Sequence, residues 1–296
     1  NTGMLIYSDE ELENKVRAAH ARGLRLEVHA IGDRAAEQVV GAFRRAGLGP
    51  GDRPVLTHCQ VLSDSTMQNM VELGVIANIQ PSFVPTDCNW VKQRLSPGAR
   101  RRGYRWRSYL AAGLGVAGGS DAPVETCRPL VGMDDAMHRE PKDFERCEGE
   151  AVFMPEERLT FAEALWIYTK GAAFASKDEE HLGDIKENYY ADFVVIRQQN
   201  EEDSQGSKTI KTEDLSIQSL KMWEIDSVWV DGIKSILEEP LCESGRTNSG
   251  SIQDGALATE IIPGKNGMLR TSDELHANFF RKEMARILVN KCSCCL

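Results

Sequence analysis

His29, His58 and Asp121 each end a short, mostly apolar run of the kind that forms a β-strand. The two histidines lie 29 residues apart, which is too far for a pair on one helix but fits two neighbouring strand–helix units. In α/β sheets and barrels, ligands bind at the carboxyl ends of the strands. Imidazole and carboxylate are also suitable ligands for a catalytic zinc with one position left open for water. The pattern therefore predicts a metal site made by these three side chains.

Each of the three residues also has an ordinary structural interpretation. A single histidine at a strand end is more often a satisfied structural residue than a ligand. Asp121 follows Gly-Gly-Ser and could cap a turn. Their joint placement favours the metal site, because all three stand at the same point of a repeating unit, at the ends of the first, second and fourth strands.

The elements that must position these residues alternate along the first 140 or so residues. Strand patterns occupy 24–29, 55–58, 75–79 and 114–121; helical patterns occupy 9–22, 33–46, 64–73, 104–112 and 129–139; residues 82–103 have the character of a long loop. Ser8 and Asp33 are expected to cap the first two helices. Strands that alternate with helices predict parallel βαβ units, so the fold class is α/β.

The second half of the chain changes character after a helical pattern at 160–175. Short strand patterns then follow one another without helices between them, at 181–185, 191–196 and 226–236. We expect three parts: a strand–helix domain over 1–178, a small β domain over 179–237, and a largely disordered tail over 238–296 with one helix near 273–289.

Composition excludes several classes of protein. The net charge of −10 argues against binding to nucleic acid or to anionic lipid, since both need a basic face. No apolar run approaches the roughly 18–20 residues that span a bilayer, and no secretory signal is visible. Eight cysteines, three of them in the last five residues, do not form a disulfide framework. We therefore expect a reduced, cytoplasmic protein.

Five short phrases make a more specific prediction. They are HAIGDRA (29–35), THCQ (57–60), NIQPSF (78–83), GGSDAPVE (118–125) and LGDIKENYYADFVVI (182–196). In this order and spacing the chain resembles the amidohydrolase superfamily, specifically its amidohydrolase family 3 branch, over residues 3–236. The resemblance implies a distorted (β/α)₈ TIM-type barrel beside a small β-sandwich. It also implies metal ligation by His29 on barrel strand 5, His58 on strand 6 and Asp121 on strand 8.

The same resemblance implies hydrolysis of a carbon–nitrogen bond that is not a peptide bond, in a small amide-type substrate. A divalent metal, most plausibly Zn²⁺ with one or two ions, would lower the pKa of its bound water toward about 7. Asp121 would take the proton and pass it to the leaving amine. Gln60 and Gln80 are candidates for substrate hydrogen bonds, Arg34 for lining the pocket or pairing with Asp33. Cys59 is expected in the core.

The sequence also departs from the family pattern. It contains no His-x-His pair, and strands equivalent to the first four of the barrel are missing. We therefore expect the C-terminal half of a barrel, strands 5–8, followed by part of the sandwich, as in a fragment of a longer enzyme. Such a half would pair with the missing N-terminal half or form a homo-oligomer. The alternative function is a truncated, catalytically incompetent half-barrel that acts as an interaction or regulatory protein.

Overall fold

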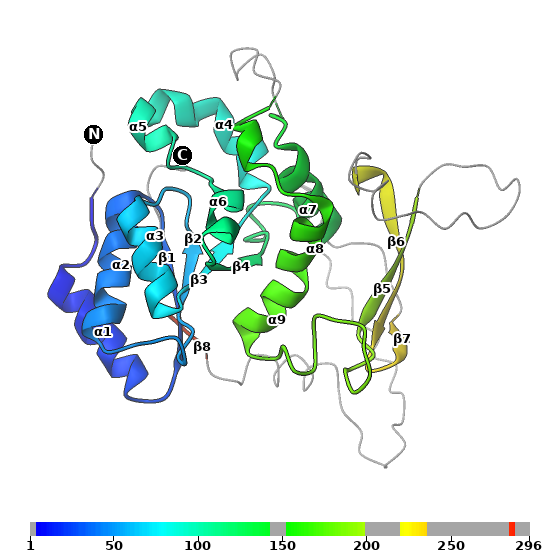
Figure 1. The fold of residues 1–296 in the computed structure, drawn as a ribbon, viewed down its shortest axis with the longest axis horizontal. Coiled ribbons are helices and arrows are strands. Elements are labelled where there is room, and N and C mark those ends of the chain that lie inside the picture. Colours follow the sequence, from blue (N-terminus) through cyan, green and yellow to red (C-terminus); the bar gives the residue numbers. More distant parts are fainter. Residues whose placement is uncertain (1–3, 143–151, 199–219, 236–283, 288–296) are drawn as a thin grey trace, which may run out of the picture.

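The computed structural model describes residues 4–142, 152–198, 220–235 and 284–287, which form two sheets and the helices around them (Figure 1). The larger sheet is parallel and has the strand order β4-β3-β2-β1-β8. Its strands are β1 (Arg25–Ala30), β2 (Val55–His58), β3 (Ile76–Ile79), β4 (Gly115–Gly118) and β8 (Met284–Ile287). A mixed α/β fold with a parallel sheet is thus confirmed.

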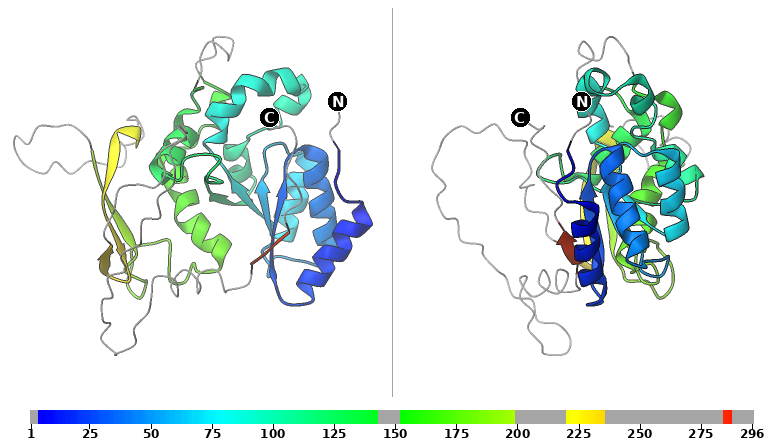
Figure 2. Two further views of the ribbon diagram at one scale, coloured as in Figure 1. Left: turned by 180° about the vertical axis from the view of Figure 1, so that it is seen from behind. Right: turned by 90° about the vertical axis from the view of Figure 1, so that its left-hand side faces the viewer.

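Helices follow the strands of this sheet in the order expected for βαβ units. They are α1 (Asp9–His20), α2 (Asp33–Arg45), α3 (Asp64–Leu73), α4 (Phe83–Arg94), α5 (Pro97–Arg100), α6 (Trp106–Ala111), α7 (Pro129–His138), α8 (Phe161–Tyr168) and α9 (Lys170–Ser176). Helices α1–α3 lie on one side of the sheet (Figures 1 and 2). None of the helices in the described ranges is both long and apolar enough to cross a bilayer.

The two faces of β1 differ in chemistry. Leu26, Val28 and Ala30 are buried and belong to the main core together with residues of α1 and α2. Glu27 and His29 alternate with them, so they lie on the opposite face, where they are half-buried. The register pairs His29 with Thr57 on β2. This second face of the sheet therefore carries the polar side chains that the candidate site needs.

A smaller antiparallel sheet lies on the far side of α8 and α9 from the parallel sheet (Figures 1 and 2). It consists of β5 (Phe193–Gln198), β6 (Trp223–Val230) and β7 (Ile233–Ser235) in that order. Its connection to α7 is made by Lys221, whose ammonium lies 3.2 Å from Asp134 and 3.1 Å from Asp135. Both aspartates are buried, so this contact fixes the start of β6 against the helical layer.

Several expected elements need correction. Residues 82–103 are not a long loop, because they contain α4 and α5. Pro85 and Pro97 each lie in the first turn of a helix, where a missing N–H costs little. The helical stretch 160–175 is interrupted at Thr169, whose φ of −122° and ψ of −88° are not helical. Residues 181–185 form turns and no strand.

The structure also bears on the expected cap of α2 and on the helix expected near 273–289. Gly32 with φ 100°, and not Asp33, is the N-cap of α2; the Asp33 side chain instead accepts from the Arg34 N–H at 2.9 Å and pairs with Arg102 at 3.3 Å. Most of the helix expected near 273–289 lies outside the described residues. The four residues of it that are described form strand β8.

The capping box at the start of α8 permits a first test of local stability. Thr160 accepts from the Glu163 N–H, and the Glu163 carboxylate accepts from the Thr160 N–H at 2.7 Å. Thr160→Ala is expected to lower the free energy of unfolding by about 1 kcal/mol, because the Glu163 N–H loses its acceptor. Urea unfolding measures the change. Ser176→Ala, which removes a hydroxyl at the last residue of α9, should cost less, and an equal loss in both variants would contradict the capping role.

Candidate metal centre

His29 and His58 meet at the carboxyl ends of β1 and β2. The His58 Nε2 lies 2.7 Å from the His29 Nδ1, and the ring centroids are 4.4 Å apart in an edge-on arrangement with an interplanar angle of 82°. The parallel register pairs His58 with Ala30, the residue after His29, and the left-handed backbone of His58, with φ 83°, departs from the strand alternation at this point. The structure thus brings together two of the three residues that the sequence predicts as ligands.

The His58 ring is held on all sides. It is 1 % exposed, its Nδ1 lies 2.8 Å from the Gln80 Oε1, and its plane stacks on Phe83 at 5.8 Å between centroids. The pKa of His58 is lowered to about 4, mainly by burial and also by the neighbouring His29, while the hydrogen bond to Gln80 opposes this shift. The ring is therefore neutral at neutral pH, as a metal ligand must be.

His29 is more accessible than His58, and a third residue, Asp121, also affects its pKa. Burial lowers its pKa, and the carboxylate of Asp121 raises it. Asp121 lies three residues beyond β4 in an exposed turn with φ 55°. Its charge therefore acts on His29. Within the described residues, no three or more His, Cys, Asp or Glu side chains are arranged as a metal-binding group.

The donor chemistry of the histidine pair nevertheless fits a divalent cation. Two nitrogens of a tetrahedral zinc site lie about 3.3 Å apart, given Zn–N distances of about 2.0–2.1 Å. The two facing nitrogens are 2.7 Å apart. To bind an ion together, they would have to move apart by roughly half an ångström. His58 presents this nitrogen from a fixed position, because its other nitrogen is already bound to Gln80.

The remaining predicted site residues take different positions. Gln80 is buried and contacts His58 directly. Gln60 is also buried, and its amide donates to Asp87 at 3.2 Å. Arg34 is exposed on α2, where it pairs with Glu37 at 3.1 Å. Cys59 is fully buried, which confirms its place in the core.

Asp87 belongs to this end of the sheet and was not predicted from the sequence. Its carboxylate accepts from the Tyr104 hydroxyl at 2.7 Å as well as from Gln60. It lies four residues after Phe83, one helical turn along α4 and on the same side as the residue that stacks on His58. That relation becomes visible only once residues 83–94 are recognised as a helix.

Asp87 gives the protein a predictable pH dependence. The pKa of Asp87 is raised from 3.8 to about 6, mainly by burial and also by Glu125, whereas the hydrogen bond from Tyr104 opposes the shift. The folded state thus holds this proton more tightly than the unfolded chain, so the stabilisation is present below pH 3.8 and is lost as the pH rises through about 6.

Asp87→Asn, which resembles the protonated acid, is therefore expected to be more stable than the wild type by about 1–3 kcal/mol near pH 7.5. The difference should disappear near pH 4. Urea unfolding of both proteins across this range measures it. A constant difference at all pH values would contradict the assignment.

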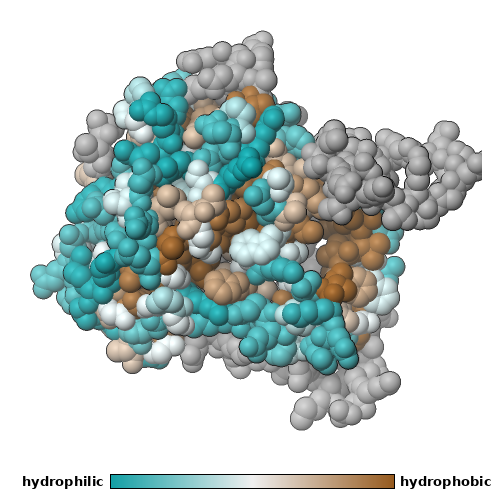
Figure 3. All heavy atoms as spheres, in the orientation of Figure 1, coloured by the Kyte–Doolittle hydropathy of each residue, from teal (hydrophilic) through white to brown (hydrophobic). Residues whose placement is uncertain are grey.

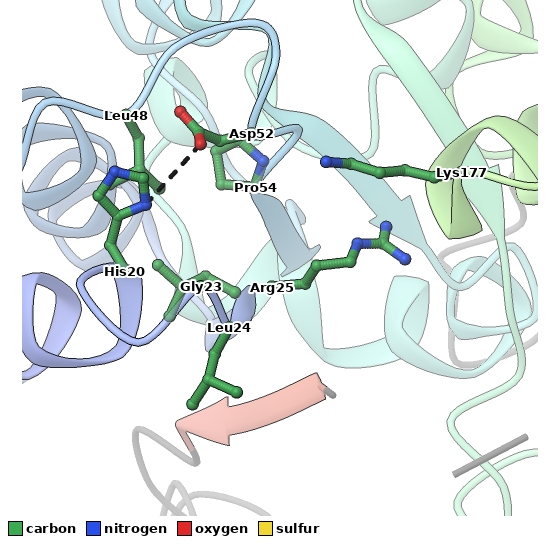
Figure 4. A pocket seen from close by; sticks show the side chains of 9 residues that line it. His20, Gly23, Leu24, Arg25, Leu48, Asp52, Pro54 and Lys177 are labelled. Carbon is green, nitrogen blue, oxygen red and sulfur yellow. Dashed lines mark ion pairs between the residues drawn. The ribbon is translucent and has the colours of Figure 1, made fainter. Parts of the chain in front are cut away.

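A small cavity of about 110 Å³ lies at the opposite end of the sheet, before β1 and β2 begin (Figure 4). His20 and Asp52 face each other across it with 3.7 Å between Nδ1 and Oδ1. Lys177 reaches toward it from beyond α9 and donates to the Gly51 carbonyl at 3.0 Å. This histidine is therefore far from the pair at the carboxyl ends and serves as a natural control for it.

Comparison with known proteins gives a family match over most of the chain. The model of a family described as "Amidohydrolase family" matches residues 2–233. A protein of Bacillus subtilis (strain 168) described as "Putative amidohydrolase YtcJ" is 34% identical over 194 residues. The N-substituted formamide deformylase of Arthrobacter pascens is 27% identical over 204 residues. Each match covers 66% of this chain and 36% of the relative.

A solved structure agrees with these relatives. The uncharacterized metal-dependent hydrolase of Pyrococcus furiosus superposes with a TM-score of 0.55 at 28% identity, covering 64% of this chain and 37% of that protein. The chain therefore spans little more than a third of the length of the proteins it matches.

Proposed function

Because this chain belongs to the amidohydrolase family, we propose that it carries part of the active site of a metal-dependent hydrolase that cleaves carbon–nitrogen bonds other than peptide bonds. The observation that carries the proposal is the facing pair of neutral imidazole nitrogens at the strand ends, 2.7 Å apart. The relative that acts on N-substituted formamides supports a small amide-type substrate.

In this proposal His29, His58 and Asp121 hold a divalent cation, with zinc favoured by two imidazole ligands and a carboxylate. A bound cation would supply hydroxide at neutral pH and polarise the substrate carbonyl. Asp121 takes the proton released during attack and gives it to the leaving amine, for which its exposed position at the mouth of the sheet is suitable. His58 stays neutral throughout, because its burial disfavours the imidazolium.

We further propose that β1–β4 with their helices are one half of a (β/α)₈ barrel. The face of the sheet that carries Glu27, His29, Thr57 and Asn78 would then line the barrel interior. Its lower part is covered by Phe174 and Ala175 of α9, which pack on Val55, Ile76 and Ala117. The complementary half would come from a longer polypeptide or from another chain, and the β5–β7 sheet would be part of a sandwich.

A second candidate function, an interaction protein, is favoured by the apolar surface of the smaller sheet. Val194, Val230 and Ile233 are 51 %, 49 % and 60 % exposed. Apolar surface gathers over β5 and β6 on the right of Figure 3. Apolar residues on both strands of an exposed sheet are typical of a surface that meets another protein or domain.

Zinc binding by the purified chain tests the proposed site. Isothermal titration with a competing chelator is expected to show zinc bound near neutral pH, with an affinity that falls about 100-fold in His58→Ala, since even partners of a metal ligand are worth 10–100-fold. His20→Ala is the matched control, because His20 lies at the opposite end of the sheet. Equal affinities in the wild type and His58→Ala would remove the proposed site, and no binding by either would do the same.

A further inference from the structure

We propose that Gln80 is a positioning residue that fixes the proton of His58 on Nδ1 and so aims the lone pair of Nε2 at His29. Its consequence for hydrolysis rests on the proposed function, whereas the position of the proton is a property of the chain by itself. A continuous series of hydrogen bonds across β1, β2 and β3 determines that position.

The Gln80 amide has only one favourable orientation. Its Nε2 donates to the main-chain carbonyl of Asn78 at 3.3 Å and to the Asn78 Oδ1 at 3.4 Å. A main-chain carbonyl only accepts hydrogen bonds, so the amide cannot be reversed without placing two oxygens against each other. The Gln80 Oε1 must therefore face His58, where it lies 2.8 Å from Nδ1. An oxygen acceptor at this distance requires the proton on Nδ1.

The Asn78 amide is fixed in the same way. Its Nδ2 donates to the Glu27 Oε1 at 2.8 Å, and the Thr57 hydroxyl donates to the same oxygen at 2.6 Å. An ionised carboxylate is an acceptor only, so Asn78 must offer its amide nitrogen to Glu27 and its Oδ1 to Gln80. The series of donors therefore ends at the carboxylate of Glu27, which sets its direction and lies two residues before His29 on the same face of β1.

The packing leaves these groups in one arrangement. Gly119 lies beside them, and a Cβ at this position would lie 3.1 Å from the Asn78 Oδ1. Phe83 stacks nearly parallel to the His58 ring, at 14°, which fixes the plane of the imidazole. Gln80 is 2 % exposed, so solvent offers no competing partner.

The position of this proton determines which group His58 presents to His29. With the proton on Nδ1, the His58 Nε2 is a lone-pair donor that faces the His29 Nδ1 at 2.7 Å. Without a cation, His29 donates its Nδ1–H to this lone pair. With a cation, the same two nitrogens are the ones available to share it. Gln80 thus holds His58 in the ligating tautomer before any ion arrives.

Nitrogen-15 NMR of the metal-free chain with labelled histidine tests this directly, because the two ring nitrogens report which of them carries the proton. The wild type is expected to show His58 with its proton on Nδ1. In Gln80→Leu the ratio of the Nδ1–H form to the Nε2–H form should fall about tenfold, the equivalent of one lost hydrogen bond.

The matched control is Thr57→Val, which removes one donor to Glu27 but leaves Asn78 and Gln80 in contact. Its His58 signals should stay as in the wild type. An unchanged ratio in folded Gln80→Leu would overturn the inference. If that variant does not fold, the wild type decides alone, because a proton on Nε2 there is incompatible with the role of Gln80.

Zinc titration of the same variants separates this inference from the proposed function. Gln80→Leu should bind zinc about 10–100-fold more weakly than the wild type. A wild-type chain that carries the proton on Nδ1 but binds no zinc would overturn the metal site and leave the positioning role intact. Tight zinc binding together with an unchanged tautomer in Gln80→Leu would overturn the positioning role and leave the metal site intact.

Discussion

Asp121→Asn is expected to lower kcat for hydrolysis of N-formyl and N-acyl amines by about 10²–10⁴-fold, the range that a positioned general base contributes. The asparagine has the same shape but cannot accept the proton released as hydroxide attacks. The charge of Asp121 acts on His29, where it opposes the lowering of the His29 pKa by burial. The assay uses the protein at its native length and measures the released amine.

Asp226→Asn is the matched control for that experiment. Asp226 is an exposed residue of β6 in the smaller sheet, and its replacement makes the same change of charge. Its kcat should equal that of the wild type. If Asp121→Asn retained wild-type turnover, Asp121 would have no role in proton transfer, whatever the metal content of the protein.

Much of the parallel sheet could be predicted from local patterns. Residues 55–58 and 64–73 were expected as a strand and a helix, and both occur with these bounds as β2 and α3. Ser63 and Gly74 mark the ends of α3 by a side-chain cap and a left-handed residue with φ 64°. Such signals lie within a few residues of each other, so a single sequence contains them.

The long-range polar contacts could not be predicted in this way. Glu27 and Asn78 lie in strand patterns and Gln80 follows one directly. Single polar residues there carry no signal of a partner, and the bond from Asn78 to Glu27 joins residues 51 positions apart. The sequence pattern placed His29 and His58 at the same edge of the sheet. Their nitrogens come within 2.7 Å at a point where the His58 backbone has φ 83°, which the strand pattern does not predict.

The helices that close the sheet depend on a different feature, the close approach of α9 to β4. A Cβ added at Gly171 would overlap the carbonyl oxygen of Val116 and lie 2.9 Å from the Trp166 ring. Neither neighbour can yield easily, because one is main chain of the sheet and the other is a large ring packed against the core. Gly171 therefore allows α9 to lie directly on the strand.

Gly171→Ala is accordingly expected to lower the free energy of unfolding by about 3 kcal/mol, at the upper end of the cost of overpacking. Gly98→Ala is the control, since Gly98 also lies in the first turn of a helix, α5, but a Cβ there meets nothing within 4 Å. That change should be neutral or stabilising by up to about 1 kcal/mol, because alanine favours the helix. Urea unfolding of the two variants gives the comparison. Equal midpoints for both would show that α9 can move away from β4 at no cost, and would remove the close approach as the reason for a glycine at position 171.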